Sequence, residues 1–162
     1  MPKALAAKAR AMQINPDAQI DARTLFYDET TADQIDLSGY DYVADCIDSV
    51  YSKLLLVQRA REAGAEIVCS MGAGNKLDPS RFELAYIEDT SVCPLARAMR
   101  RELRKRGIAR VKVVYSREEP LPARDGAHAP GSISFVPGAA GLVLAGEIIR
   151  EIAGIHLLEA KK

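Results

Sequence analysis

Residues 41–53 constrain the fold of this chain more than any other segment, because they join a short strand pattern directly to a helix pattern. The apolar residues 42–44 end at Asp45, Asp48 follows, and Lys53 lies one turn into the helical pattern. In an open α/β sheet the carboxyl end of a strand faces the ligand crevice. The segment therefore predicts that two carboxylates and a lysine converge where phosphates and Mg²⁺ bind. The alternative is structural, since acidic residues at strand ends and helix starts often serve only as caps.

Strand and helix patterns alternate through the first part of the chain. Helical or turn segments are expected over residues 3–13, 31–37 and 49–63, and strands over residues 19–27, 42–44 and 66–70. This order predicts a parallel sheet with crossover connections, that is, a partial Rossmann-like α/β fold. After residue 74 we expect strands over 82–87, 111–116 and 133–136, helices over 94–106 and 139–152, and a loop over 119–131. The chain is therefore expected to form a single domain over 1–162, Rossmann-like over 1–74 and mixed α+β over 75–162.

Charge and cysteine content narrow the class of protein further. The 22 basic and 22 acidic residues balance, so net charge supplies no general attraction to nucleic acid or to a membrane. The three cysteines, Cys46, Cys69 and Cys93, have no CxxC spacing, which argues against a disulfide framework and for reduced thiols. No apolar run approaches the roughly 20 residues that cross a bilayer. These features predict a cytoplasmic protein with no membrane partner.

Several motifs occur in one order almost from end to end. They are Lys3 with residues 14–16, the segment 41–48, residues 72–74 with 78–79, residues 94–97 followed by 100–104, residues 114–116 with Glu118, and residues 131–137 before Gly141 and 145–147. Together they resemble the ThiF/MoeB/HesA superfamily of ubiquitin-activating-like adenylating enzymes, and most closely its tRNA threonylcarbamoyladenosine dehydratase branch. The resemblance implies ATP-dependent adenylation of a carboxylate on a modified adenosine in tRNA, followed by ring closure. It also implies ATP, Mg²⁺ and tRNA as cofactors and partners.

The same resemblance suggests roles for four residues of the candidate site. Asp48 matches the metal-associated aspartate and Lys3 the lysine that reaches the phosphates, so both are candidate catalytic residues. Asp45 and Lys53 are candidates for cofactor binding. For Asp45 we expect that it orders the strand end by accepting backbone hydrogen bonds. For Lys53 two alternatives remain open, a pair with Asp48 or a solvated side chain.

One element of the resemblance has no match in this sequence. No GxGxxG fingerprint occurs, because residues 72–74 continue as Asn75-Lys76-Leu77. We therefore expect the chain to correspond to the C-terminal part of a dehydratase, inactive alone, with an unpaired strand edge over residues 42–44 that promotes self-association. Two alternatives are a non-enzymatic dimerisation or binding module and an enzyme that adenylates a sulfur-carrier or ubiquitin-like C-terminus. The absence of CxxC pairs counts against the last.

The second half of the chain supplies candidate contact surfaces. The arginines Arg97, Arg100, Arg101 and Arg104 have the spacing of one helix face and are candidates for binding tRNA phosphates, although a solvated face with Glu102 interleaved is the plain alternative. Gly141 and Gly146 lie in the last apolar helix and indicate close packing, either at a homodimer interface or in the core.

The cysteines have simpler expected roles. Cys46 and Cys69 are expected to be small buried hydrophobes. Cys93 stands where the resemblance leads us to expect an aspartate, and we expect it to be the most exposed of the three.

Overall fold

The structure is a computed structural model that describes residues 1–122 and 129–158. It contains two compact units, Met1–Ile35 and Asp36–Lys162. In the first unit, helix α1 (Lys3–Ile14) confirms the predicted N-terminal helix, and the Asn15 side chain accepts a hydrogen bond of 3.1 Å from the Asp17 amide in the turn that follows. The strand predicted over residues 19–27 is wrong, because this stretch is irregular. No described strand pairs with it, and a lone strand cannot satisfy its backbone groups.

The second unit is built on a mixed sheet. Its strands are β1 (Tyr42–Asp45), β2 (Glu66–Ser70), β3 (Phe82–Tyr86) and β4 (Lys112–Ser116), and its α-helices are α2 (Val50–Glu62), α3 (Pro94–Lys105) and α4 (Phe135–Ile152). Short 3-10 helices lie at Leu37–Gly39, Pro79–Arg81 and Ile87–Asp89. Most of the elements predicted for this unit are present, with ends shifted by at most a residue or two except at the start of α4, which lies four residues earlier than predicted.

The sheet has the order β1-β2-β4-β3 among the described residues. β1 is parallel to β2 and β2 to β4, whereas β3 is antiparallel to β4. The α/β fold, Rossmann-like at first and mixed afterwards, is therefore confirmed. Among the strands that the structure describes, β1 pairs only with β2, so its outer side is a sheet edge that includes the residues 42–44 expected from the sequence.

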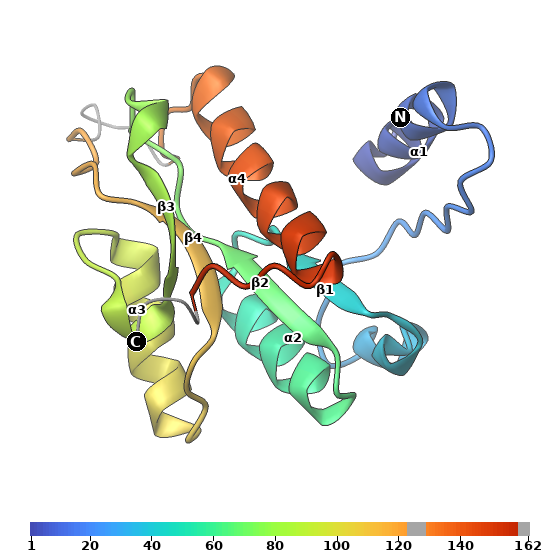
Figure 1. Cartoon of the computed structure of the whole chain (residues 1–162), viewed down its shortest axis with the longest axis horizontal. Coiled ribbons are helices and arrows are strands. Elements are labelled where there is room, and N and C mark those ends of the chain that lie inside the picture. The colour runs from blue at the N-terminus through green and yellow to red at the C-terminus, as the bar shows by residue number, and fades with distance from the viewer. Residues whose placement is uncertain (123–128, 159–162) are drawn as a thin grey trace. The chain divides into compact units, whose positions relative to one another are not determined.

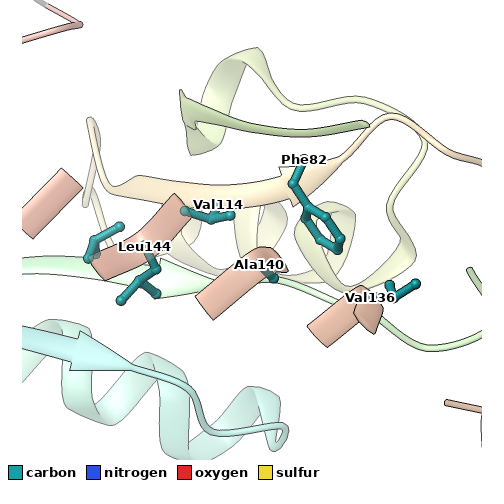
Figure 2. Close-up of a cluster of buried hydrophobic side chains, with 6 residues drawn as sticks. Phe82, Val114, Val136, Ala140 and Leu144 are labelled. Atoms are coloured by element: carbon teal, nitrogen blue, oxygen red, sulfur yellow. The ribbon is translucent and has the colours of Figure 1, made fainter. Parts of the chain in front are cut away.

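Helices cover both faces of this sheet (Figure 1). α4 packs against β2, β3 and β4 on one face, while α2 packs against β1, β2 and α3 on the other. The α4 face is closed by a cluster in which Phe82 and Val114 from the sheet meet Val136, Ala140 and Leu144 from the helix (Figure 2). The sheet is therefore the middle one of three layers.

The beginning of α4 differs from the sequence prediction. The strand expected over residues 133–136 is wrong, because the helix already begins at Phe135. Pro137 explains the difference: proline has no N–H to donate to a strand ladder but is tolerated in the first turn of a helix. The loop predicted over residues 119–131 lies partly outside the described residues. Across the ranges 1–122 and 129–158, no helix is long and apolar enough to span a bilayer.

Candidate functional site

A buried ion pair fixes the connection between β1 and α2. Lys53 Nζ lies 2.9 Å from Asp45 Oδ2, and both side chains have an exposed fraction of 0%. The other carboxylate oxygen of Asp45 accepts a hydrogen bond of 3.0 Å from the Ile47 amide. The prediction that Asp45 orders the strand end is therefore confirmed.

The position of Lys53 differs from both alternatives that the sequence left open. Lys53 neither pairs with Asp48 nor is solvated, but points from the buried face of α2 to the end of β1. The reason is its position on the helix, where its neighbours Ser52 and Leu54 are buried as well. An ammonium buried there requires a counter-charge, and Asp45 supplies it. Both groups are thus placed to support the loop between them rather than to contact a ligand directly.

That loop carries Asp48. Asp48 is exposed and directly precedes Ser49, whose hydroxyl accepts a hydrogen bond from the Ser52 amide at the start of α2. The loop follows the carboxyl end of β1, and the loops after β2 and β4 leave the same end of the sheet because these strands are parallel. We call this end the carboxyl edge. It is the position at which open α/β sheets bind ligands.

The side chains at the carboxyl edge fit a magnesium ion that is held partly by phosphate oxygens and waters, rather than a metal ion enclosed by protein ligands alone. Among the described residues, no group of three or more His, Cys, Asp or Glu side chains could hold a metal. Mg²⁺ is commonly held by one or two carboxylates together with phosphate oxygens and waters. An exposed carboxylate such as Asp48 fits that arrangement, and it would be one ligand among several.

The loop after β2 is tied to the loop after β4, which sequence reasoning missed. The Glu118 carboxylate accepts hydrogen bonds from the amides of Leu77 and Asp78, at 2.8 and 2.9 Å, and the Lys76 ammonium donates to the Glu118 carbonyl. Lys76 is almost fully buried, and this burial lowers its pKa. Asn75 turns the chain in the left-handed region, with φ of 56°. These hydrogen bonds therefore stabilise the carboxyl edge in addition to the Asp45–Lys53 pair. In the sequence, Glu118 was singled out only as part of the family motif.

Lys3 lies in the first turn of α1 and is exposed. It belongs to the first compact unit, whereas Asp48 belongs to the second. Its predicted contact with phosphates therefore stays a prediction.

The arginines of α3 fall into two groups. Ala96, Met99 and Leu103 form the buried stripe of the helix, which leaves Arg97, Arg101 and Arg104 exposed. Arg100 is different, because its guanidinium donates to the carbonyl and the hydroxyl of Thr90, both at 2.6 Å. Of the four predicted tRNA-binding residues, three are therefore exposed in one row. Arg100 instead stabilises the segment at Thr90, before the helix.

Acidic neighbours reduce the charge of part of this row. Glu102 pairs with Arg101 at 3.0 Å and with Lys105 at 2.9 Å. We call the row Arg97, Arg101 and Arg104 the α3 arginine face. Among the contacts of the described residues, Arg101 is the one member of this face that forms an ion pair. The positive charges of Arg97 and Arg104 are therefore the ones most available to an anionic partner.

The cysteine predictions were partly wrong. Cys46 is exposed, whereas Cys69 and Cys93 are buried. Cys93 directly precedes α3 and packs against the loop after β2, with its Sγ near Gly72, so its thiol replaces a capping side chain without making a cap hydrogen bond. Partial burial and the neighbouring Asp45 carboxylate raise the pKa of the Cys46 thiol. These surroundings disfavour the thiolate form that a nucleophilic cysteine requires.

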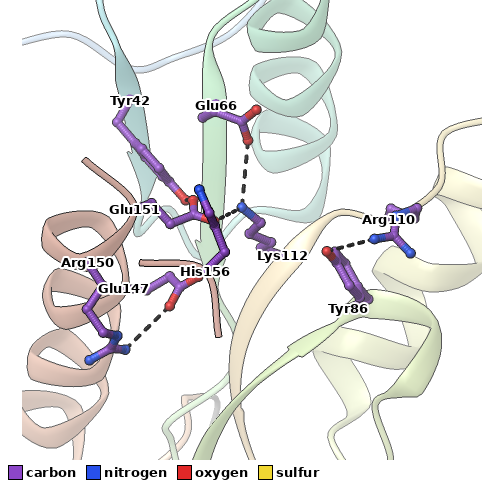
Figure 3. Close-up of polar contacts among 9 residues, drawn as sticks. All are labelled: Tyr42, Glu66, Tyr86, Arg110, Lys112, Glu147, Arg150, Glu151 and His156. Atoms are coloured by element: carbon purple, nitrogen blue, oxygen red, sulfur yellow. Dashed lines mark hydrogen bonds and ion pairs between the residues drawn. The ribbon is translucent and has the colours of Figure 1, made fainter. Parts of the chain in front are cut away.

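The opposite end of the sheet contains the larger polar cluster (Figure 3). The Tyr42 hydroxyl donates to Glu151 at 2.5 Å, Lys112 pairs with the same carboxylate, and His156 lies 3.7 Å from it. A cavity of about 460 Å³ opens beside this cluster and is lined by Arg61, Glu66, Tyr86, Arg110 and Lys112 among others. Lys112 begins β4 and Glu66 begins β2, so this cavity is at the amino end of the parallel strands. It is remote from Asp48 and is not the nucleotide site that the family motifs imply.

With this geometry, comparison with known proteins identifies the family. The chain matches the ThiF family over residues 1–162. It belongs to that family. It is 35% identical to a tRNA threonylcarbamoyladenosine dehydratase of Bacillus subtilis over 167 aligned positions, which cover 93% of this chain and 66% of the relative.

Solved structures agree with this assignment. The Escherichia coli tRNA N6-threonylcarbamoyladenosine dehydratase TcdA has been solved with AMP, where it is 28% identical to the chain, and with ATP, where it is 27% identical. Each comparison gives a TM-score of 0.83 and covers 94% of this chain but 64% of the TcdA chain. The ThiF-family chain described here thus spans slightly less than two thirds of these relatives, and they share its α/β fold over that length.

Proposed function

We propose that this chain is the portion of an ATP-dependent tRNA threonylcarbamoyladenosine dehydratase that contains the metal side of the nucleotide site. The observation that carries the proposal is the exposed Asp48 carboxylate at the carboxyl edge, held by the buried Asp45–Lys53 pair. The relatives that match nearly the whole chain are dehydratases of this kind, and TcdA binds both ATP and AMP. The site and the relatives therefore support the same chemistry.

In this proposal the reaction has two steps. A carboxylate oxygen of the threonylcarbamoyl group attacks the α-phosphorus of ATP and releases pyrophosphate, which forms an acyl adenylate. A nucleophile within the same group then attacks the activated carbonyl and expels AMP, so that the ring closes with net loss of water. Bound Mg²⁺ would neutralise charge on the phosphate oxygens.

The residues of this chain have distinct parts in the proposal. Asp48 contributes a carboxylate ligand at the metal, and Lys3 neutralises phosphate charge. Asp45 and Lys53 are positioning residues, because their pair is buried and fixes the loop on which Asp48 lies. Such preorganisation favours charge stabilisation without rearrangement during the reaction.

The tRNA partner would be contacted by the α3 arginine face. Its three exposed arginines are one turn apart on a helix, a spacing that suits successive phosphates of a nucleic-acid backbone. Cytoplasmic location belongs to the same proposal, because the three cysteines are free thiols and the proposed substrate is a tRNA.

A second candidate is a non-enzymatic binding module. It is favoured by the exposed apolar residues of α4, Leu142 and Ile149. Activity in a complete active site separates the two candidates.

The test uses a chimera in which this chain replaces the matching two thirds of the Bacillus subtilis relative. The proposal predicts tRNA-dependent release of AMP from ATP by the chimera. Asp48→Asn should lower that rate at least about a hundredfold, because the amide keeps the shape but removes the charge at the metal. Asp41→Asn is the matched control, since Asp41 is an exposed aspartate at the amino end of β1. Near-normal turnover by the Asp48→Asn chimera would contradict the proposed role.

A further inference from the structure

The cavity at the amino end of the parallel strands is lined mainly by cationic and apolar side chains. Its volume is about 460 Å³, which lies within the roughly 300–1,000 Å³ of small-molecule sites. Among the described lining residues, the charged side chains are three cations and a single carboxylate: Arg61, Arg110, Lys112 and Glu66. The buried apolar residues of the lining, which we call the floor, are Ala65, Ile67 and Val111. Such a lining favours an anionic ligand that also has an apolar part.

The two arginines of the cavity lie at the same turn of the chain. The Arg61 guanidinium donates a hydrogen bond to the carbonyl of Ala109, which directly precedes Arg110. The Arg110 guanidinium donates to the Tyr86 hydroxyl at 2.9 Å. Among the contacts of the described residues, neither guanidinium pairs with a carboxylate. Because a guanidinium has more N–H donors than these contacts use, both arginines keep donors for a ligand.

Arg110 is held in place from both its side chain and its backbone. Its guanidinium carbon lies 4.2 Å from the centre of the Tyr86 ring, above which the side chain is stacked (Figure 3). Its φ of 56° is in the left-handed region, which residues other than glycine rarely adopt. The Glu88 carboxylate stabilises this conformation by accepting a hydrogen bond of 2.8 Å from the Arg110 amide. A side chain fixed in this way loses little conformational entropy when an anion binds.

The third cation of the lining is largely neutralised within the chain. Lys112 pairs with Glu151 and lies 3.8 Å from Glu66 Oε2. The Glu66 side chain is 68% exposed, so its attraction for Lys112 is weak. The positive charge that a ligand would meet is therefore mainly that of the two arginines, and Glu66 is the group that opposes an anion.

The pair of arginines points to a phosphate. We propose that this cavity binds a small phosphate monoester, with the phosphate between Arg61 and Arg110 and the organic group on the floor. The planar fork of a guanidinium matches two oxygens of a phosphate, and two such forks match the double charge of a monoester. The cavity lies at the end of the sheet opposite the loop that carries Asp48. This inference therefore does not depend on the proposed adenylation.

An NMR titration of the whole chain with phenyl phosphate tests the site, because this probe combines a phosphate monoester with a flat apolar group. The amides of Gly64, Ala65 and Val111 should shift on binding, since these residues line the cavity. We expect a dissociation constant of about 1 mM for a probe of this size. Inorganic phosphate should bind at least about fivefold more weakly, because it makes no contact with the floor. Absence of shifts at these amides, or equal affinity for the two probes, would overturn the proposal.

Substitutions in the lining give effects of opposite sign. Arg61→Gln and Arg110→Gln should each weaken phenyl phosphate binding at least about fivefold, because each removes a charged donor. Glu66→Gln should instead strengthen it about two- to fivefold, because it removes the carboxylate that repels the anion. Arg117→Gln is the matched control, since Arg117 is an exposed arginine that follows the other end of β4. It should leave the affinity unchanged.

The outcomes separate a specific site from general attraction by charge. Equal weakening by Arg61→Gln and Arg117→Gln would refute the site, and so would weaker binding by Glu66→Gln. Circular dichroism checks that each variant is folded. If Arg110→Gln is unstable because of the left-handed backbone at that position, Arg61→Gln and Glu66→Gln still decide the question, because both of these side chains are exposed.

A short RNA duplex distinguishes a free monoester from the phosphates of a nucleic acid. The backbone of the duplex presents phosphodiesters, each with a single charge and no free organic group to reach the floor. We expect the duplex to leave phenyl phosphate bound to the cavity. Displacement of phenyl phosphate by the duplex, lost again in Arg61→Gln, would show that the cavity binds nucleic acid and would overturn its assignment to a small molecule.

Discussion

Replacing Lys53 by methionine isolates the energetic role of the buried ion pair. The substitution keeps an apolar stem of similar length but removes the ammonium that lies 2.9 Å from Asp45 Oδ2. Both side chains are fully buried, so the Asp45 carboxylate would lose its counter-charge without gaining water. The Ile47 amide and the Cys69 thiol would remain as hydrogen-bond donors to it.

Removing one partner of a buried pair costs about 3–5 kcal/mol. The remaining hydrogen bonds to the carboxylate offset part of that cost, so we expect a loss of about 3 kcal/mol. Domains of this kind are stable by about 5–15 kcal/mol, which leaves the variant folded enough to measure. With a urea dependence of about 1–3 kcal/mol per molar, the midpoint should fall by roughly 1–3 M.

A surface pair of equal length provides the control. Lys105 Nζ also lies 2.9 Å from a carboxylate oxygen, that of Glu102, but the exposed fractions of the two side chains are 64% and 22%. Lys105→Met should therefore cost only about 0–1 kcal/mol. Urea unfolding followed by circular dichroism compares the two variants directly. Equal losses for Lys53→Met and Lys105→Met would refute the argument that burial, rather than distance, sets the value of the pair.

Three further outcomes follow from the site and its surroundings. Arg101→Ala with Arg104→Ala should weaken tRNA binding and flatten its salt dependence in filter-binding titrations, whereas Arg100→Ala should lower the melting temperature because Arg100 holds Thr90. Burial raises the pKa of Glu147 above its unfolded value, so the native state binds the extra proton between the two values and stability falls as pH rises through that window. Glu147→Gln should reduce this slope in urea unfolding measured at a series of pH values above the unfolded-state pKa of a glutamate. The 162-residue chain alone should release no AMP from ATP, since its sequence has no GxGxxG turn to hold a triphosphate.

The sequence predicted the parallel part of the sheet because its signals are local. The pattern over residues 41–53 contains a strand end, a capping serine and an apolar helix face, and β1 and α2 form accordingly. The failed strands show the limit of such signals. Residues 19–27 have strand-like composition but no described partner strand, and pairing is a tertiary property. At residue 135 the proline of the first helical turn was a local signal, but the apolar run outweighed it in the prediction.

The residues of the site were predictable by type but not by partner. Asp45, Asp48 and Lys53 could be selected from spacing, yet the choice of counter-ion for Lys53 depends on which helix face is buried against the sheet. The same holds for Arg100, which has the helical spacing of its neighbours but is turned toward Thr90. Exposure of Cys46 and burial of Cys93 likewise follow from packing around the loops, which short motifs do not encode.

The α3 arginine face and the loop with Asp48 are both supported from the α2 side of the sheet. α3 contacts α2 on one side of the sheet, while α4 covers the other side (Figure 1). The loop with Asp48 lies at the carboxyl edge, between these two layers, and the Asp45–Lys53 pair holds it from the α2 side. Loss of the exposed α3 arginines should thus weaken tRNA binding without moving Asp48, whereas loss of the buried pair should change the position of Asp48 itself.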